Sequence, residues 1–176
     1  MKLDYAQALK RVDEARGAWI MYGQEPLLEQ NLLDAFRKTW HKQEIERQRY
    51  DISNTSDWKN VFNALNSLSL FSNQLAIEVH GQIKPDANGI KQLKSYIQHN
   101  EQNLLLVVMP KQDSSSLKSS FFQVIDANGV TVPLTANYPQ DRQRILKIAA
   151  EKLGIKLAND AWQWLEQHHE HNLLAA

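Results

Sequence analysis

The sequence contains no cysteine among its 176 residues. This absence excludes a disulfide framework, a zinc site built on thiolates and a cysteine nucleophile, and it fits a reducing, cytoplasmic setting. An excess of charge of either sign is also missing, since 20 basic side chains balance 20 acidic ones. A surface that binds a phosphate backbone usually carries clustered Lys and Arg, so the composition argues against a polyanion-binding surface.

Long hydrophobic runs are missing as well. The longest apolar run, Leu104 to Met109, is far shorter than the roughly 18 residues that would indicate a membrane span. Residues 1–7 include an early acid and no continuous apolar stretch, so they do not predict a secretory signal peptide. With 43% hydrophobic residues, the chain has the composition of a globular protein with one domain, or one domain and part of a second.

Apolar patterns typical of strands and helices alternate along most of the chain. Leu28, Leu32, Phe36 and Trp40 repeat at i, i+4, which predicts a helix with one apolar face. The expected strands are 18–22, 47–52, 74–79, 103–109 and 130–134, and the expected helices are 3–12, 26–40, 57–67, 86–99 and 117–125. Because residues 74–79 alternate apolar and polar side chains, we expect that strand to be half-buried. The alternation of elements predicts an α/β fold with a mainly parallel sheet and helices on both faces.

The pattern changes near residue 139. The spacing from Ile145 to Leu153 predicts a helix, which Gly154 ends, and a second helix begins at Asn159. We therefore expect an α/β domain over 1–139 and part of an all-helical domain over 140–176. The last residues have the pattern of a further helix without a stop signal, and so few helices cannot bury their apolar faces. We expect the natural chain to continue.

The turn Gly23–Pro26 lies where a nucleotide-binding α/β domain places its phosphate loop. Such a loop needs Gly-x4-Gly-Lys-Ser/Thr, because the glycines admit phosphate, the lysine supplies charge and the hydroxyl binds magnesium. Counted from Gly23, Glu29 occupies the lysine position, where a carboxylate repels phosphate. The sequence predicts no bound nucleotide, and a nucleotide-dependent α/β enzyme with a divergent phosphate loop is the alternative.

Two other clusters could carry chemistry. His168 to His171 lacks the His-Glu-x-x-His spacing of a helical zinc site, so a solvated helix face is the favoured interpretation and a metal-dependent hydrolase a lesser rival. The serines within 111–116 are typical of a plain loop, and the sequence has no Gly-x-Ser-x-Gly elbow. We expect no catalytic residue, no metal and no cofactor.

Residues 66–73 place a Leu–Phe pair, Leu70 and Phe71, between an expected helix and an expected strand. Apolar pairs at the ends of elements are usually buried, so core packing is one interpretation. An exposed pair would instead be a compact anchor for a hydrophobic pocket on a partner, because binding hot spots are few, large and apolar. The spacing alone leaves both open.

Three stretches together resemble the delta subunit of the bacterial DNA polymerase III clamp loader. Residues 18–28, with Gly-Gln-Glu-Pro-Leu-Leu, are similar to that family's first strand and turn, where Gly-(Asn/Gln)-(Asp/Glu)-Pro-Leu-Leu replaces a phosphate loop. Residues 57–71 resemble its clamp-binding region, and residues 148–176 its helical second domain, although His171 stands where the family commonly has glycine. The resemblance implies a P-loop-ATPase-like (AAA+-like) domain without a functional nucleotide site, followed by the start of a small helical lid domain.

The resemblance also implies a function. The delta subunit binds the ring-shaped sliding clamp (beta clamp) and helps open it for loading onto primed DNA during replication. Leu70 and Phe71 would insert into the hydrophobic cleft of the clamp, and their neighbours in the clamp-binding set would be Asn66, Ser67, Leu68 and Ser69. Clamp-binding peptides often begin with glutamine, and Asn66 is one methylene shorter.

The implied partners are the beta clamp and the other clamp-loader subunits, which are gamma/tau and delta prime. Both of these subunits would be reached through a C-terminal domain that this sequence lacks. The resemblance implies contact with DNA only within the assembled loader and no contact with a membrane. No intrinsic catalysis is implied, although the family carries the DNA-directed DNA polymerase label as a component of the DNA polymerase III holoenzyme.

Overall fold

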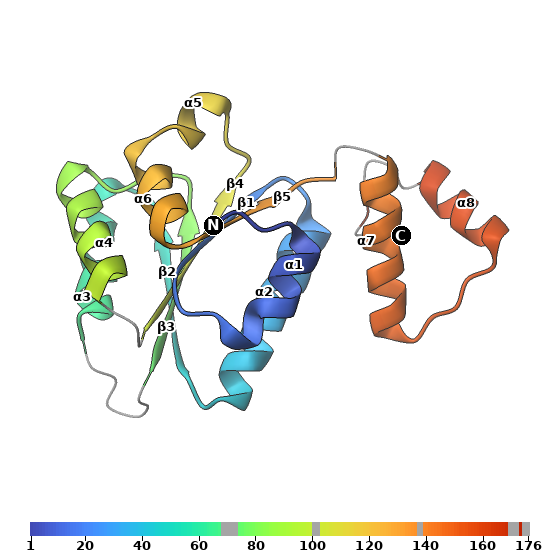
Figure 1. Ribbon diagram of the computed structural model, residues 1–176, viewed down its shortest axis with the longest axis horizontal. Helices are drawn as coiled ribbons and strands as arrows, with labels where there is room; N and C mark the ends of the chain where they lie inside the picture. The colour runs from blue at the N-terminus through green and yellow to red at the C-terminus, as the bar shows by residue number, and fades with distance from the viewer. Residues whose placement is uncertain (68–73, 100–102, 137–138, 169–172, 174–176) are drawn as a thin grey trace.

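The computed structural model describes residues 1–67, 74–99, 103–136, 139–168 and 173, and it places a parallel sheet between two layers of helices (Figure 1). The strands are β1 (Gly17–Gly23), β2 (Glu46–Ile52), β3 (Leu75–Gly81), β4 (Leu104–Pro110) and β5 (Val130–Leu134). The helices are α1 (Tyr5–Arg11), α2 (Pro26–Lys42), α3 (Trp58–Leu65), α4 (Ala87–His99), α5 (Ser114–Leu117), α6 (Ser120–Asn128), α7 (Pro139–Leu153) and α8 (Asn159–His168). Short 3-10 helices precede β1 (Val12–Glu14) and α3 (Thr55–Asp57). None of these helices is both long and apolar enough to cross a membrane.

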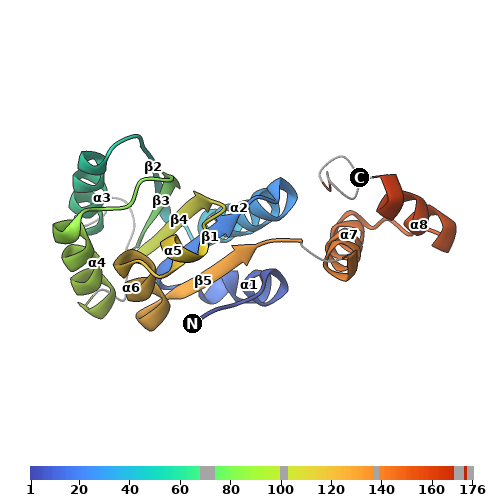
Figure 2. The same ribbon diagram turned by 90° about the horizontal axis from the view of Figure 1, so that it is seen from above.

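The five strands lie in the order β2-β3-β4-β1-β5, and all the paired strands are parallel. Helices α1 and α2 cover one face of the sheet, and α3, α4 and α6 cover the other (Figures 1 and 2). The α/β fold with helices on both faces, expected from the alternation of elements, is confirmed.

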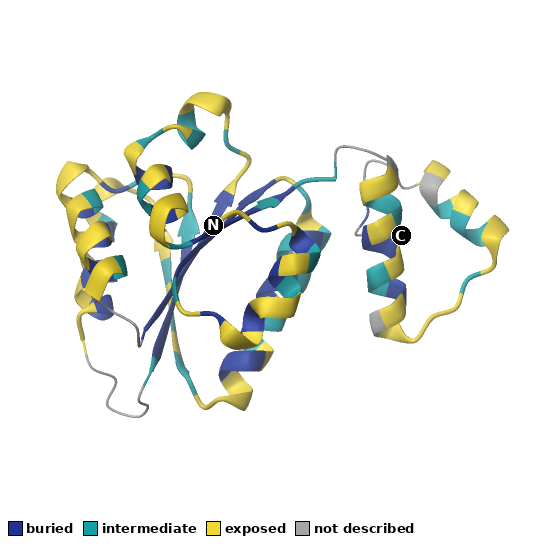
Figure 3. Cartoon of the chain, viewed as in Figure 1, coloured by how far each residue is buried: buried dark blue, intermediate teal, exposed yellow. Residues whose placement is uncertain are grey.

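The central strands are buried on both sides (Figure 3). In β1, Trp19 and Met21 pack toward α2, whereas Ala18, Ile20 and Tyr22 pack toward the opposite helices. This explains why β1 and β4 are continuous apolar runs in the sequence, since a strand covered on both faces has no position for a solvated side chain.

Helix α2 buries the apolar stripe that its i, i+4 spacing predicts. Leu28, Leu32, Phe36 and Trp40 are all buried, and the ring of Phe36 meets that of Trp19 edge to face with centroids 5.4 Å apart. This packing fixes the position of α2 over β1, and with it the turn that joins them.

Two helix starts differ from expectation because polar side chains cap them. The expected helix 117–125 is two helices, since the Asp113 side chain accepts a hydrogen bond from the Ser116 amide (2.7 Å) and starts α5 early. Helix α6 then begins at Ser120. Before α3, Asn54 and Asp57 form a capping box around the 3-10 helix Thr55–Asp57, so α3 begins at Trp58, one residue later than the expected helix 57–67.

Strand β3 is also different from expectation, because it is buried on both faces from Leu75 to Val79 and includes a fully buried acid, Glu78. The half-buried interpretation was wrong, since the polar side chain in the alternation faces charged partners under α2 and not water. Glu78 Oε1 accepts from Arg37 Nη2 (2.7 Å), Oε2 from Arg37 Nε (3.2 Å) and Arg47 Nη1 (3.4 Å), and His80 Nε2 lies 2.6 Å from Oε1.

These contacts set the ionisation of Glu78. Burial alone would raise the pKa of this carboxyl, but hydrogen bonds from His80 and Arg37 outweigh it and lower the pKa to about 2. The paired carboxylate joins β3 to β2 through Arg47 and to α2 through Arg37. Removing the arginines would leave the buried carboxylate of Glu78 without compensation, whereas Arg37 and Arg47 are themselves partly exposed.

We predict that Glu78→Gln lowers the free energy of unfolding at pH 7 and flattens its dependence on pH. The folded pKa of Glu78 lies below its ordinary value of 4.5, so its contribution is present above pH 4.5 and is lost as the pH falls toward 2. A contribution on the order of 2 kcal/mol is expected at neutral pH. Urea unfolding of both proteins between pH 7 and pH 2.5 measures it; a stability difference that stays constant over this range would contradict the assignment.

Candidate functional site

The carboxyl ends of β1, β3 and β4 enclose a pocket of about 570 Å³ beside the start of α2. Open α/β proteins bind ligands at this edge of the sheet, so the pocket is where a nucleotide phosphate would lie. Its lining includes Gly23, Glu29, Gln30, Arg37 and His80.

The residues in this pocket do not suit phosphate. A Cβ at Gly23 would collide with the carbonyl oxygen of Leu134, so the close approach of β1 and β5 already requires a glycine here. Glu29 lines the pocket in the first turn of α2, the position expected for the lysine of a phosphate loop. The guanidinium of Arg37 is held by Glu78.

Glu25, the N-cap of α2, adds to the mismatch. Its Oε1 is buried with no hydrogen-bond partner among the described residues, and burial raises the pKa of this carboxyl. Glu29 therefore stands where the lysine of a nucleotide site would be and Gln30 where its hydroxyl residue would be, and Glu25 adds a second acid at the N-terminus of α2.

The remaining sequence-predicted clusters hold no catalytic arrangement among the described residues. His168 stacks on Trp164 with ring centroids 4.4 Å apart, and its Nδ1 lies 2.8 Å from the Trp164 carbonyl oxygen. Within the described part of the chain no three His, Cys, Asp or Glu side chains could hold a metal ion, while residues 169–171 lie outside that part. In the serine cluster, the Ser115 hydroxyl donates to the Asp113 cap (3.0 Å), which is a structural role.

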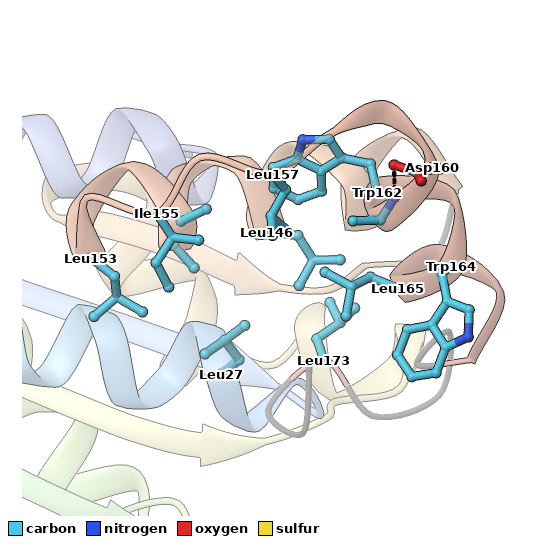
Figure 4. Close-up of a pocket in the computed structure, with 13 residues that line it drawn as sticks. Leu27, Leu146, Leu153, Ile155, Leu157, Asp160, Trp162, Trp164, Leu165 and Leu173 are labelled. Atoms are coloured by element: carbon cyan, nitrogen blue, oxygen red, sulfur yellow. Dashed lines mark hydrogen bonds between the residues drawn. The ribbon is translucent and has the colours of Figure 1, made fainter.

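A second pocket, of about 730 Å³, is apolar and lies between α7, α8 and the first turn of α2 (Figure 4). Leu153, Ile155 and Trp164 line it and are 73%, 48% and 54% exposed. The carboxylate of Asp160 accepts from the amide of Ala161 (2.9 Å), so the acid in its lining is engaged locally. Such a groove can bind an apolar surface but offers no group arrangement for catalysis.

In the chain, the expected clamp-binding residues fall between the end of α3 and the start of β3, and β3 starts at the opposite, amino edge of the sheet. Asn66 and Ser67 are exposed and cap α3, with the Asn66 amide donating to Phe62 O (3.1 Å) and the Ser67 amide to Ala64 O (3.0 Å). The other members of the set, Leu68, Ser69, Leu70 and Phe71, lie outside the described residues. Whether the Leu–Phe pair is buried or exposed therefore stays a prediction.

Sequence reasoning missed Asn103, which it assigned to a strand of apolar residues. The side chain of Asn103 accepts from the Leu75 amide (3.0 Å) and donates to the Leu65 carbonyl oxygen (3.1 Å), so it contacts both elements that border residues 66–74. The available signal was a lone amide side chain at the head of a continuous apolar run, where a buried polar group needs specific partners.

The strand order and the two helix layers define an α/β protein with a five-stranded parallel sheet between helices. Among solved structures, the DNA clamp loader delta protein of Bacillus subtilis is similar to the chain with a TM-score of 0.68 and 11% identity, over 92% of this chain and 51% of that one. Domain III of the replication initiation protein DnaA from Thermotoga maritima gives a TM-score of 0.54 and 12% identity, over 97% and 77% of the two chains.

The sequence comparisons narrow this class to one family. The model of the DNA polymerase III delta subunit family matches residues 19–134, and the chain belongs to this family. DNA polymerase III subunit delta of Escherichia coli strain K12 is 29% identical over 164 residues, which are 91% of this chain and 48% of that protein. The chain thus spans about half the length of these delta relatives, and the resemblance noted in the sequence is confirmed.

We predict that ATP or GTP with magnesium leaves the melting temperature of this chain within about 1 °C of its value with magnesium alone. The reason is the acidic start of α2, where Glu29 stands in place of a lysine. A nucleotide bound at 100 times its Kd would stabilise the fold by about 2.7 kcal/mol, an effect that a thermal melt detects readily. A saturable rise would instead favour the nucleotide-dependent enzyme.

Proposed function

We propose that this chain is the clamp-gripping part of a clamp-loader delta subunit, which binds the sliding clamp and helps open it during DNA replication. The observation that carries the proposal is the family match over residues 19–134, which runs through the candidate clamp-binding residues 66–71 between α3 and β3. The relative of known structure named a DNA clamp loader delta protein supports the same role.

The binding step rests on Leu70 and Phe71, which we assign to the hydrophobic cleft of the clamp, with Asn66, Ser67, Leu68 and Ser69 as neighbours. Two adjacent large apolar side chains can supply most of the binding energy of a small interface. In the chain they stand between the end of α3 and the first residue of β3, which is at the amino edge of the sheet, and the pocket at the carboxyl edge lies at the other end of the strands. Clamp binding therefore does not require any ligand in that pocket.

Opening follows from differential binding. If the chain contacts the subunits of an open ring better than those of a closed ring, it shifts the equilibrium toward opening by the difference between the two affinities. No covalent step is needed for this shift. We propose no enzymatic activity for this chain and a place for it in the cytoplasm.

The remaining parts of the proposal concern assembly. We assign residues 1–139 to the clamp-binding α/β domain and 140–176 to part of the helical lid domain. The other loader subunits, gamma/tau and delta prime, would be contacted through a C-terminal domain, and DNA would be met only in the assembled loader. The open apolar groove between α7 and α8 fits a lid domain with more helical surface to pack.

We predict that the double variant Leu70→Ala, Phe71→Ala loses clamp binding while staying folded. Each anchor should contribute on the order of 2 kcal/mol or more, so the double variant should bind at least several hundredfold more weakly. Isothermal titration of the chain with the cognate sliding clamp measures the affinity, and circular dichroism checks the fold.

The matched control is Leu153→Ala, Ile155→Ala, which likewise truncates two large apolar side chains, here in the groove beside α7. This control should bind the clamp as the unsubstituted chain does. Clamp binding that survives in the Leu70, Phe71 variant would show that the anchor lies elsewhere, and no binding by the unsubstituted chain would overturn the proposed function.

A further inference from the structure

The two residues that flank segment 66–74, Leu65 and Leu75, are both hydrogen-bonded to one side chain, that of Asn103. On the helix side, Nδ2 of Asn103 donates to the carbonyl oxygen of Leu65, the last residue of α3 (3.1 Å). On the strand side, Oδ1 of Asn103 accepts from the amide of Leu75, the first residue of β3 (3.0 Å). The last carbonyls of a helix have no partner within the helix, so the amide also serves as a cap for α3.

The surroundings of Asn103 keep this side chain in place. The residue is buried, as are Leu65 and Leu75, and the hydroxyl of Tyr96 on α4 donates to the Asn103 backbone carbonyl oxygen (2.7 Å). Asn103 itself directly precedes β4, whose first residue, Leu104, pairs with Ala76 of β3. A buried amide with its carbonyl oxygen and NH₂ group both engaged has one preferred orientation, since any other leaves a polar atom without a partner.

We propose that Asn103 is a positioning residue for clamp binding: it fixes both ends of segment 66–74 and so holds Leu70 and Phe71 ready for the clamp. The inference rests on the proposed function and adds a residue that does not itself touch the clamp. The bonds to Leu65 and Leu75 set where the segment leaves α3 and where it enters β3.

The physical reason is the entropy of ordering a binding segment. A segment whose ends are fixed has fewer conformations in the free protein, so less order is lost when its anchors enter a pocket. If Asn103 is truncated, the carbonyl oxygen of Leu65 loses one hydrogen-bond donor and the first amide of β3 loses the Asn103 acceptor, so both ends are held less firmly. The sheet itself keeps its β3–β4 ladder, because that ladder is made by main-chain bonds.

The test compares Asn103→Ala with the control Tyr96→Phe by clamp titration and by hydrogen exchange. Tyr96→Phe removes one buried hydrogen bond at the same place but leaves both bonds of the Asn103 side chain. We expect Asn103→Ala to bind the clamp about tenfold more weakly than the unsubstituted chain, while Tyr96→Phe binds within about twofold of it. The Leu75 amide should exchange faster in Asn103→Ala and be unchanged in Tyr96→Phe.

A second variant covers the case in which Asn103→Ala does not fold. Asn103→Asp keeps an acceptor for the Leu75 amide, but it replaces the donor to Leu65 by a carboxylate oxygen that repels the Leu65 carbonyl oxygen, so it releases the α3 end of the segment. A free peptide of residues 66–73 gives the affinity of the segment without any fixed ends. The affinity of a folded Asn103 variant should move from that of the unsubstituted chain toward that of the peptide.

The outcomes separate the two proposals. Affinities of the folded Asn103 variants equal to that of a clamp-binding unsubstituted chain would overturn the positioning role and leave the proposed function intact. An equal loss in Tyr96→Phe would also overturn it, because general destabilisation would then explain the effect. Failure of the unsubstituted chain to bind the clamp would overturn the proposed function, and the positioning role with it.

Discussion

The burial of β1, β3 and β4 on both faces is the constraint on which the rest of this structure depends. A parallel sheet in water needs helices on each side, and each crossover between parallel strands passes over one face. As a result, the chain turns only at the two edges where strands begin and end. The carboxyl edge carries the pocket beside α2, and the amino edge carries the segment between α3 and β3. These two edges are separated by the full length of the strands.

At the carboxyl edge, the fold keeps the shape of a nucleotide site but not its chemistry. Gly23 is needed for the close packing of β1 against Leu134, so a glycine at the end of the first strand has a structural reason that involves no phosphate. The acids Glu25 and Glu29 at the start of α2 then oppose the helix's natural affinity for anions. The shape of this edge therefore suits a phosphate, whereas its negative charge disfavours one, and the charge decides whether phosphate binds.

Much of the fold could be predicted from the sequence, because its strands and the stripe of α2 are set by hydrophobic patterns that are local in the chain. Glu78 could not be read correctly, since its partner Arg37 lies 41 residues away and the pair forms only when α2 packs on β3. Asn103 was missed for the same reason, since its partner Leu65 comes from another element. Asp113 shows a more local limit, because one cap was enough to start a separate helix within a serine-rich stretch.

The candidate clamp-binding segment was identified from its position between an expected helix and an expected strand and from the family resemblance. No pattern within the segment distinguishes an exposed Leu–Phe pair from a buried one. Leucine and phenylalanine are among the residue types most often buried, so residue type alone favours burial of Leu70 and Phe71. What the structure adds is the framework on either side, namely the capped end of α3 and the first residue of β3.

Under the proposed function, that framework bears on how binding alone could open a ring. Binding energy can favour an open ring only if the anchor is held in a fixed direction relative to a rigid body, since a freely moving anchor would fit both states equally well. Glu78 joins the interior of β3 to α2 and β2, and Asn103 joins its first residue to the end of α3. Strand β3 is thus fixed to elements on both faces of the sheet. Under the proposed function, a force applied at the amino end of β3 would be transmitted to the whole sheet and would not unfold one loop alone.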